Sequence, residues 1–364
     1  MHPSQIIVLA TPVFFLMIAI EAWVGWRRRR VTMRFADAMG SIGAGMLSQL
    51  VGLLTGAMTL GIYVACYEHW ALWRLPDDKA WVWAVGLILY DFLYYWEHRL
   101  GHEVALLWAA HAVHHQSEDY NLSTALRQTS SGWIAGWIFF VPMALLGFSP
   151  LLFVVVGLVD LLYQYWVHTQ QIGKLGWFDR WFCAPSNHRV HHAVNEVYLD
   201  RNYGGILIVW DRLFGSFQEE LDEQPCVYGT RDALQSWNPI VANWQVYARL
   251  LRKTWIVPGL PNKLRVWFKA AHWMPAGMEP PKAEYDPYAR PLYAPEVSRG
   301  RLVAAIALFT AMLGVATVLL WDAHLMSFWA QFASMVAVAA GLSGVAWLTE
   351  ARRAPQPDAR AATA

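Results

Sequence analysis

The chain has 364 residues, of which 56% are hydrophobic, only 15% are charged and 22 are tryptophan, a composition that excludes a disordered protein and argues against a soluble globule. Its 28 basic and 27 acidic residues give a net charge of +1, so no basic field exists to attract nucleic acid as a partner. The three cysteines form no CxxC pair, which leaves no motif for a disulfide framework, a zinc knuckle or an iron–sulfur cluster.

Seven apolar stretches predict an all-α, polytopic integral membrane protein, because a spanning helix needs about 20 mainly apolar residues. The breaker sequence at 147–150 makes two of the stretches a helical hairpin, and the last two form a second hairpin near the C-terminus. One stretch, 132–146, could instead lie in the membrane interface without spanning. In chain order the stretches are 6–26, 39–66, 80–96, 132–146, 151–167, 302–321 and 327–348.

Basic residues predict which side of the membrane each loop faces. Five arginines, Arg27 to Arg30 and Arg34, follow the first stretch, whereas the next loop, 67–79, has only Arg74 and Lys79. By the positive-inside rule the first loop is cytoplasmic, and the stretch before it is a retained anchor rather than a signal peptide. Alternation of the spans then places three further parts on the cytoplasmic side: 97–131, about 168–301, and the tail with Arg352 and Arg353.

Nine of the 13 histidines fall in a regular pattern between positions 98 and 192. Eight of them form three boxes, HRLGH, HAVHH and HRVHH, and the ninth ends the fifth apolar stretch. On a helix, residues three and four apart share a face, so each box presents two ligands side by side to a point beyond that face. We expect all nine to meet at one depth, just outside the membrane on the cytoplasmic side. They are His98, His102, His111, His114, His115, His168, His188, His191 and His192.

This histidine pattern predicts a metal site with two ions. Neutral imidazole is the commonest metal ligand in proteins, and one tetrahedral zinc ion takes at most four ligands. A ligand set made almost entirely of imidazoles suits zinc, copper, iron or nickel rather than magnesium or calcium. The absence of an HExxH motif argues against a zinc protease. A metal transporter or another non-enzymatic metal-binding membrane protein remains an alternative, but it would place ligands at several depths along the spans.

The three boxes on a chain with several spans resemble the fatty acid hydroxylase/sterol desaturase superfamily, whose members are membrane di-iron oxygenases. Further runs resemble the alkylglycerol monooxygenase subfamily, and the similarity covers roughly residues 80–290; these runs are HHQSEDYNLSTALRQ (114–128), IGKLG (172–176), PSNHRVHH (185–192) and DRNYGGILIVWDRLFGSF (200–217). The resemblance implies anchor spans over 1–79, a hydroxylase-type catalytic domain with a cytoplasmic helical cap over 80–300, and a transmembrane hairpin and tail over 301–364.

The resemblance also implies an enzyme, in which two iron ions on the nine histidines activate O2 and one oxygen atom enters a C–H bond of a lipid from the bilayer. In the alkylglycerol monooxygenase subfamily this is the ether-linked carbon of an alkylglycerol, and tetrahydrobiopterin supplies the electrons. The sequence has no glycine-rich dinucleotide loop and no CxxCH motif, so a separate electron donor is expected. A hydroxylase or desaturase acting on sterols, carotenoids, fatty acyl chains or lipid headgroups is the nearest alternative.

Several polar residues are expected to support the metal ligands. Glu103 directly follows His102 and matches an acidic position of the subfamily, which implies a ligand bridging the irons or a partner of a ligand; the alternative is a solvated charge. Asn187 stands where family members have a further histidine, so it is left out of the ligand set.

Two acidic residues lie inside predicted spans. A charge there is costly, so such a residue indicates a functional role. Asp91 and Asp160 precede His98 and His168 by about two helical turns, and we expect each to accept an imidazole N–H and fix the ring; a helix–helix hydrogen bond is the alternative. The resemblance places Asn121 and Gln128 near the site. Asn195 and Asp200 follow the third box and could orient its imidazoles or cap a helix.

Overall fold

The computed structural model describes residues 3–279 and 285–350, and the regular elements within these residues are all helical. The long helices are α1 (Pro3–Arg27), α2 (Phe35–Trp70), α3 (Ala80–Glu103), α7 (Pro150–Trp166), α11 (Pro239–Ile256), α13 (Arg299–Asp322) and α14 (Phe328–Thr349). The short helices are α4 (Ala105–His115), α5 (Leu122–Ala125), α6 (Trp137–Leu145), α8 (Phe178–Trp181), α9 (Pro185–His192), α10 (Val209–Leu213) and α12 (Leu260–Phe268). The 3-10 turns are η1 (Gly132–Ile134), η2 (Glu196–Tyr198) and η3 (Ala323–Leu325).

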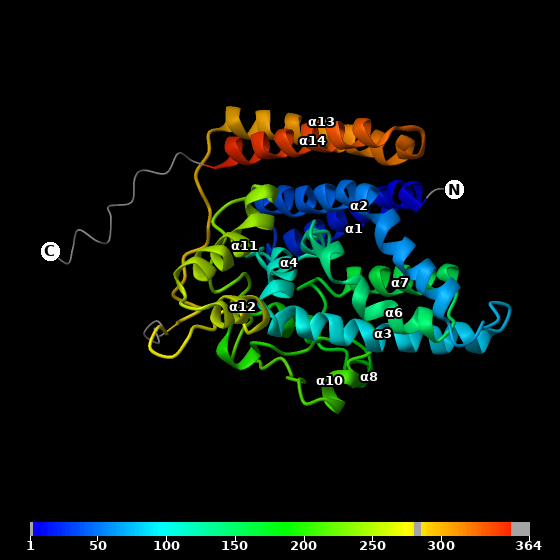
Figure 1. The fold of residues 1–364 in the computed structure, drawn as a ribbon. Helices are drawn as coiled ribbons and strands as arrows, with labels where there is room; N and C mark the ends of the chain where they lie inside the picture. Colours follow the sequence, from blue (N-terminus) through cyan, green and yellow to red (C-terminus); the bar gives the residue numbers. More distant parts are fainter. Residues whose placement is uncertain (1–2, 280–284, 351–364) are drawn as a thin grey trace.

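Helices α13 and α14 lie above α1 and α2, and α3, α6 and α7 lie below them (Figure 1). In the described part of the chain, four helical segments are long and apolar enough to cross a membrane: Ser4–Arg27, Phe35–Trp70, Arg299–Leu325 and Phe328–Thr349. They confirm the spans predicted at 6–26, 39–66, 302–321 and 327–348. Helices α3 and α7 lie where 80–96 and 151–167 were predicted.

The segment 132–146 does not form one spanning helix, so the prediction of a full span there is wrong. It consists of η1 followed by α6, which has nine residues and contains Pro142. At about 1.5 Å per residue, α6 is roughly 14 Å long, less than half of the bilayer's hydrocarbon thickness of about 30 Å. The hairpin with α7 is nevertheless present, because Ser149 caps α7 and Pro150 occupies its first turn.

The loops predicted to share one side of the membrane meet at one end of the helix bundle. The Arg34 Nε donates to Asp119 Oδ1 at 2.8 Å, and Arg28 donates to the Gln171 carbonyl at 2.7 Å. At the opposite end, the Leu72 N–H donates to the Leu145 carbonyl at 2.8 Å. The tail with Arg352 and Arg353, which the same prediction placed with the first group, lies outside the described residues.

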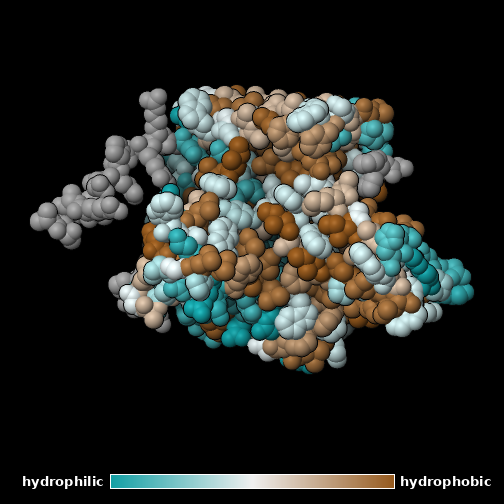
Figure 2. Space-filling view, viewed as in Figure 1, coloured by the Kyte–Doolittle hydropathy of each residue, from teal (hydrophilic) through white to brown (hydrophobic). Residues whose placement is uncertain are grey.

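Apolar side chains cover much of the outer surface of the long helices, as expected for contact with lipid. Leu16 on α1, Val303 on α13 and Trp347 on α14 are each at least 60% exposed. Figure 2 shows hydrophobic residues across the middle of one face and hydrophilic residues gathered toward its two ends. This distribution matches a protein whose middle is surrounded by lipid and whose ends are in water.

Replacement of Gly147, in the connection between α6 and α7, is expected to lower the stability of the protein measurably. Gly147 has φ +90°, and a Cβ there would lie 2.0 Å from the Trp73 carbonyl oxygen. Gly147→Ala is therefore expected to lower the free energy of unfolding by at least about 1–3 kcal/mol. Thermal unfolding in detergent measures this; Gly314→Ala, in a helical position with open space, is the matched control. Equal melting temperatures for both variants would contradict the prediction.

Candidate metal centre

Four segments carry the nine histidines to one place. His98 and His102 lie on the last turns of α3, and three more lie on α4, after a break at Val104, whose extended backbone lets the chain turn back. Buried Ala105, Ala109 and Ala112 pack α4 against α11, which fixes the second box. His168 directly follows α7, and the third box forms α9, which begins at Pro185.

The structure brings all nine predicted histidines together in two groups. Within each group, one ring nitrogen of every histidine lies within 4.8 Å of the others. The five-histidine group consists of His98, His102, His111, His115 and His191, and the four-histidine group of His114, His168, His188 and His192. The groups are adjacent, because the rings of His115 and His192 stack with their centroids 4.3 Å apart. The second and third boxes are therefore divided between the two groups, whereas both histidines of the first box belong to the five-histidine group.

The nitrogen spacing fits metal coordination. The His111 Nε2 lies 3.0 Å from the Nε2 atoms of both His98 and His115, and in the other group the His168 Nε2 lies 3.1 Å from that of His188. Two nitrogens at about 2.1 Å from one metal are about 3.0 Å apart when they subtend a right angle and about 3.4 Å apart in a tetrahedron. The observed distances of 3.0 and 3.1 Å are thus of the size expected for nitrogens that bind one metal ion. In addition, the buried Nε2 of His102 has no hydrogen-bond partner.

Backbone carbonyls fix the orientation of four of these rings. The Nδ1 atoms of His98 and His191 lie 2.8 and 3.0 Å from the carbonyl oxygens of Tyr203 and Arg201. His114 pairs in the same way with the Arg127 carbonyl at 2.9 Å, and His168 with that of Gln164 at 2.8 Å. Because a carbonyl only accepts hydrogen bonds, Nδ1 carries the hydrogen in each ring. The lone pair of Nε2 is therefore free to bind a metal.

Burial favours the neutral form of the His114, His188 and His192 imidazoles. It lowers the pKa of His114 to about 4 and the pKa of His188 and His192 well below the usual range. A neutral ring has a free nitrogen lone pair at neutral pH, which is the form that binds metal.

Two buried acids position the loop that supplies the Tyr203 and Arg201 carbonyls. Asp211 is fully buried and accepts from the N–H groups of Tyr203 and Gly204 and from the Ser216 hydroxyl, each at 2.7 Å. Asp91 was predicted to accept from an imidazole, and this is wrong. It accepts instead from the Ile206 N–H at 2.6 Å and the Trp210 indole at 2.8 Å, so it holds the next part of the same loop.

The other predicted supporting acids also lie elsewhere than expected. Asp160 accepts from the Gln164 amide at 2.6 Å and not from His168, although the carbonyl of that glutamine binds the His168 ring. Glu103 forms an ion pair with Arg99 at 2.9 Å, and its side chain is 43% exposed. It belongs to neither histidine group. The expectation that Glu103 bridges the metals is therefore wrong. Asp200 does lie near an imidazole, 3.7 Å from His102 Nδ1, a ring of the first box rather than the third.

The predicted amide side chains have local structural roles. Asn121 caps α5 and donates to the Thr32 carbonyl. Asn195 donates to the Pro225 carbonyl and accepts from the Val227 N–H, so it does not orient an imidazole. Gln128 lines the cavity described below. Asn187 donates to the backbone carbonyls of Asp179 and Phe182.

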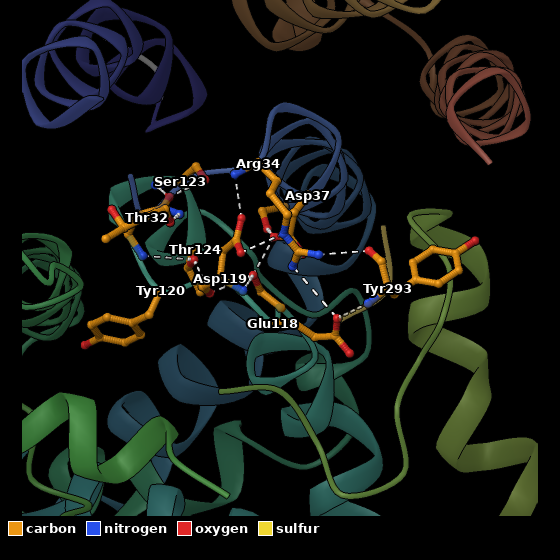
Figure 3. A network of polar contacts seen from close by, with 12 residues as sticks. Thr32, Arg34, Asp37, Glu118, Asp119, Tyr120, Ser123, Thr124 and Tyr293 are labelled. Carbon is orange, nitrogen blue, oxygen red and sulfur yellow. Dashed lines mark hydrogen bonds and ion pairs between the residues drawn. The ribbon is translucent and has the colours of Figure 1, made fainter. Parts of the chain in front are cut away.

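A polar network fixes the segment after the second box (Figure 3). Arg34 donates to Asp119 and, at 2.9 Å, to the Tyr293 carbonyl, and the Ser117 hydroxyl donates to Asp37 at 2.5 Å. The neighbouring Tyr120 ring then stacks on His168 with the centroids 5.6 Å apart. The first loop, the start of α2 and the chain before α13 thus all support one ligand of the four-histidine group.

A cavity of about 570 Å³ connects the histidines with the membrane helices. One end is lined by four ligand candidates from both groups, namely His98, His111, His114 and His168. The polar side chains of Glu97, Gln128 and Gln164 also face it, while most of the remaining wall is apolar. This volume lies within the range of about 300–1,000 Å³ that is typical of small-molecule sites. Glu97, which directly follows the predicted span 80–96, was missed by the sequence analysis; its place directly before His98 could have marked it.

Fold and site together define a polytopic membrane protein with two adjacent histidine groups, each able to hold a metal ion, at one end of its helices. Residues 83–216 match the family model described as fatty acid hydroxylase. Alkylglycerol monooxygenase of Homo sapiens is 40% identical over 267 residues, which cover 73% of this chain and 59% of that protein. The Caenorhabditis elegans protein of the same name is 34% identical over 288 residues, 71% of this chain and 57% of that protein.

A more distant relative is the ornithine lipid hydroxylase OlsE of Rhizobium tropici, which is 29% identical over 157 residues, 41% of this chain and 45% of that protein. The chain therefore spans somewhat less than three fifths of the alkylglycerol monooxygenases that it resembles. No solved structure matches it.

Proposed function

We propose that this protein is a membrane-bound di-iron monooxygenase that hydroxylates a C–H bond of a lipid, with the ether-linked carbon of an alkylglycerol as the leading target. The observation that carries the proposal is the cavity, which joins both histidine groups to the apolar interior of the membrane helices. A lipid chain can reach the metals through it without leaving an apolar environment. The similarity to alkylglycerol monooxygenases supports the choice of substrate.

In this proposal each histidine group holds one iron ion through its Nε2 atoms. Iron supplies the activation of O2, which redox-silent zinc does not provide. Backbone carbonyls orient four of the histidine rings; they belong to Tyr203, Arg201, Arg127 and Gln164. The apolar wall of the cavity excludes water from the reacting carbon.

The reaction consumes O2 and two electrons with two protons. One oxygen atom enters the C–H bond next to the ether oxygen, the other leaves as water, and the resulting hemiacetal collapses to a fatty aldehyde and glycerol. The electrons come from a separate donor, for which tetrahydrobiopterin is the first candidate and another external reductant the second. We place the site on the cytoplasmic side, because Arg27 to Arg30 and Arg34 lie at the same end of the bundle as the histidines.

Metal removal tests this function directly. Protein purified in detergent and treated with a chelator under anaerobic conditions is expected to lose conversion of hexadecylglycerol to hexadecanal, with tetrahydrobiopterin as reductant. Fe(II) should restore the activity and Zn(II) should not, because only iron changes oxidation state. Sterols, carotenoids, acyl lipids and ornithine lipids are run in parallel. If iron-loaded protein oxidises none of these lipids with any reductant, the proposed activity is wrong.

A further inference from the structure

The cavity continues away from the histidines into a region walled by α1 and α13. Helix α1 lines it with residues from its first half, including Ile6 and Phe14, and α13 with residues from its second half, including Leu313 and Thr317. Helix α1 starts, and α13 ends, at the end of the bundle opposite to the histidine-bearing end of α3 (Figure 1). This part of the cavity is therefore its far end, and both helices lie outside the matched residues 83–216.

Helix α13 is held firmly in this position at both of its ends. Near its C-terminus, the Gln5 amide on α1 donates to the Trp321 carbonyl at 3.2 Å. Near its N-terminus, the Arg301 guanidinium donates to the Leu348 carbonyl of α14 at 2.9 Å. Between them Gly341 of α14 faces Met312 so closely that a Cβ would lie 2.1 Å from its sulfur. The C-terminal hairpin is thus a packed wall of the cavity, not only an anchor.

The two ends of the cavity differ in polarity. The end beside the histidines presents Glu97, Gln128 and Gln164, whereas the α1–α13 end presents mainly aliphatic and aromatic side chains. A lipid with a polar head and one alkyl chain matches this gradient only when its head lies at the histidine end and its tail lies against α13. The reverse orientation would place polar atoms against an apolar wall, where they would lack hydrogen-bond partners.

We propose that α13 receives the end of the lipid tail, so that residues 313–320 set the length of the alkyl chain that the protein accepts. This inference rests on the proposed function, because it takes the cavity to be the lipid-binding site. It assigns the C-terminal hairpin a role in substrate selection. Helix α14, through its contact at Gly341, holds the selecting wall in place.

A substitution that fills the far end tests the inference. Thr317 is half-buried, lines the cavity and uses its hydroxyl within its own helix, on the Leu313 carbonyl at 2.8 Å. Thr317→Trp is expected to raise KM for octadecylglycerol about tenfold or more while leaving KM for dodecylglycerol within about twofold. Thr310→Trp, at an exposed position of α13 that does not line the cavity, is the matched control and should change neither. An equal loss for both chain lengths would overturn the inference.

A binding experiment separates this inference from the proposed activity. Hexadecylglycerol with a diazirine at the end of its chain is photolysed with the protein, and labelled residues are mapped by mass spectrometry. Labelling of the cavity-lining residues Leu313, Ala316, Thr317 or Leu320 that excess unlabelled hexadecylglycerol prevents supports the α13 wall, even if no lipid is oxidised and the proposed function fails. Labelling that the competitor does not reduce, or that falls only on outward-facing residues such as Val315 and Val318, overturns it.

Discussion

Replacement of His114 or of His191 by alanine is expected to reduce lipid oxidation at least about 100-fold, because each variant removes one ligand from a different metal group. The His114 Nε2 lies 3.1 Å from that of His168, and the His191 Nε2 lies 3.1 Å from that of His115. Loss of either nitrogen leaves a coordination site open and weakens the binding of one metal. Turnover of hexadecylglycerol and metal content per chain, measured on the same preparations, check both effects.

The control for these two variants is His69→Ala. His69 lies on an exposed turn near the end of α2, in neither histidine group, so its replacement should leave turnover and metal content unchanged. Size-exclusion chromatography in detergent establishes whether all three variants insert and fold. Full activity in a folded His114 or His191 variant would refute the assignment of that group as a metal site.

Asp211→Asn is expected to weaken metal binding about 10–100-fold although Asp211 touches no imidazole. Its carboxylate accepts from two backbone N–H groups and one hydroxyl, whereas an amide oxygen replaces only one of the two oxygens. The N–H group left without an acceptor costs about 1–3 kcal/mol and releases the Tyr203 carbonyl from its place against His98. A competition titration with a chelator, at a temperature where the variant remains folded, measures the change in affinity.

Asp222→Asn provides the matched control for this prediction. Asp222 has the same side chain but is 89% exposed and pairs only with Lys174. It should therefore keep the metal affinity and the melting temperature of the unchanged protein. A purely structural role of Asp211 would lower the melting temperature alone, and an unchanged affinity in Asp211→Asn would contradict the proposed positioning of His98.

The sequence predicts the nine histidines because their grouping depends largely on local geometry. Residues four apart share a helix face, and His98 and His102 indeed enter one group from one helix. Residues three apart do not share a group here: His111 and His114 are divided between the two groups, and so are His188 and His191. The sharing of boxes between the two groups is not predictable in this way. His114 and His115 are neighbours in sequence yet lie in different groups, because successive helical residues point about 100° apart.

The groups that orient the rings could not be predicted from residue types. Four imidazoles are held by backbone carbonyls, which every residue has, so the sequence carries no signal for them. Asp91 was correctly singled out as a costly charge within a helix, but its partners come from a loop 115 residues later in the chain. The length of 132–146 was likewise misjudged, because apolar composition alone does not show that a helix there is interrupted after Ile134.

The number of iron ions per chain tests the central claim most directly. Protein from iron-supplemented cells, purified in detergent without oxygen, is analysed by elemental mass spectrometry against a protein concentration from amino-acid analysis. The two histidine groups predict about two irons per chain, and Mössbauer spectra should show high-spin iron with nitrogen ligands. A preparation that remains free of iron after anaerobic reconstitution with Fe(II), or that binds only one ion per chain, would contradict a di-iron centre.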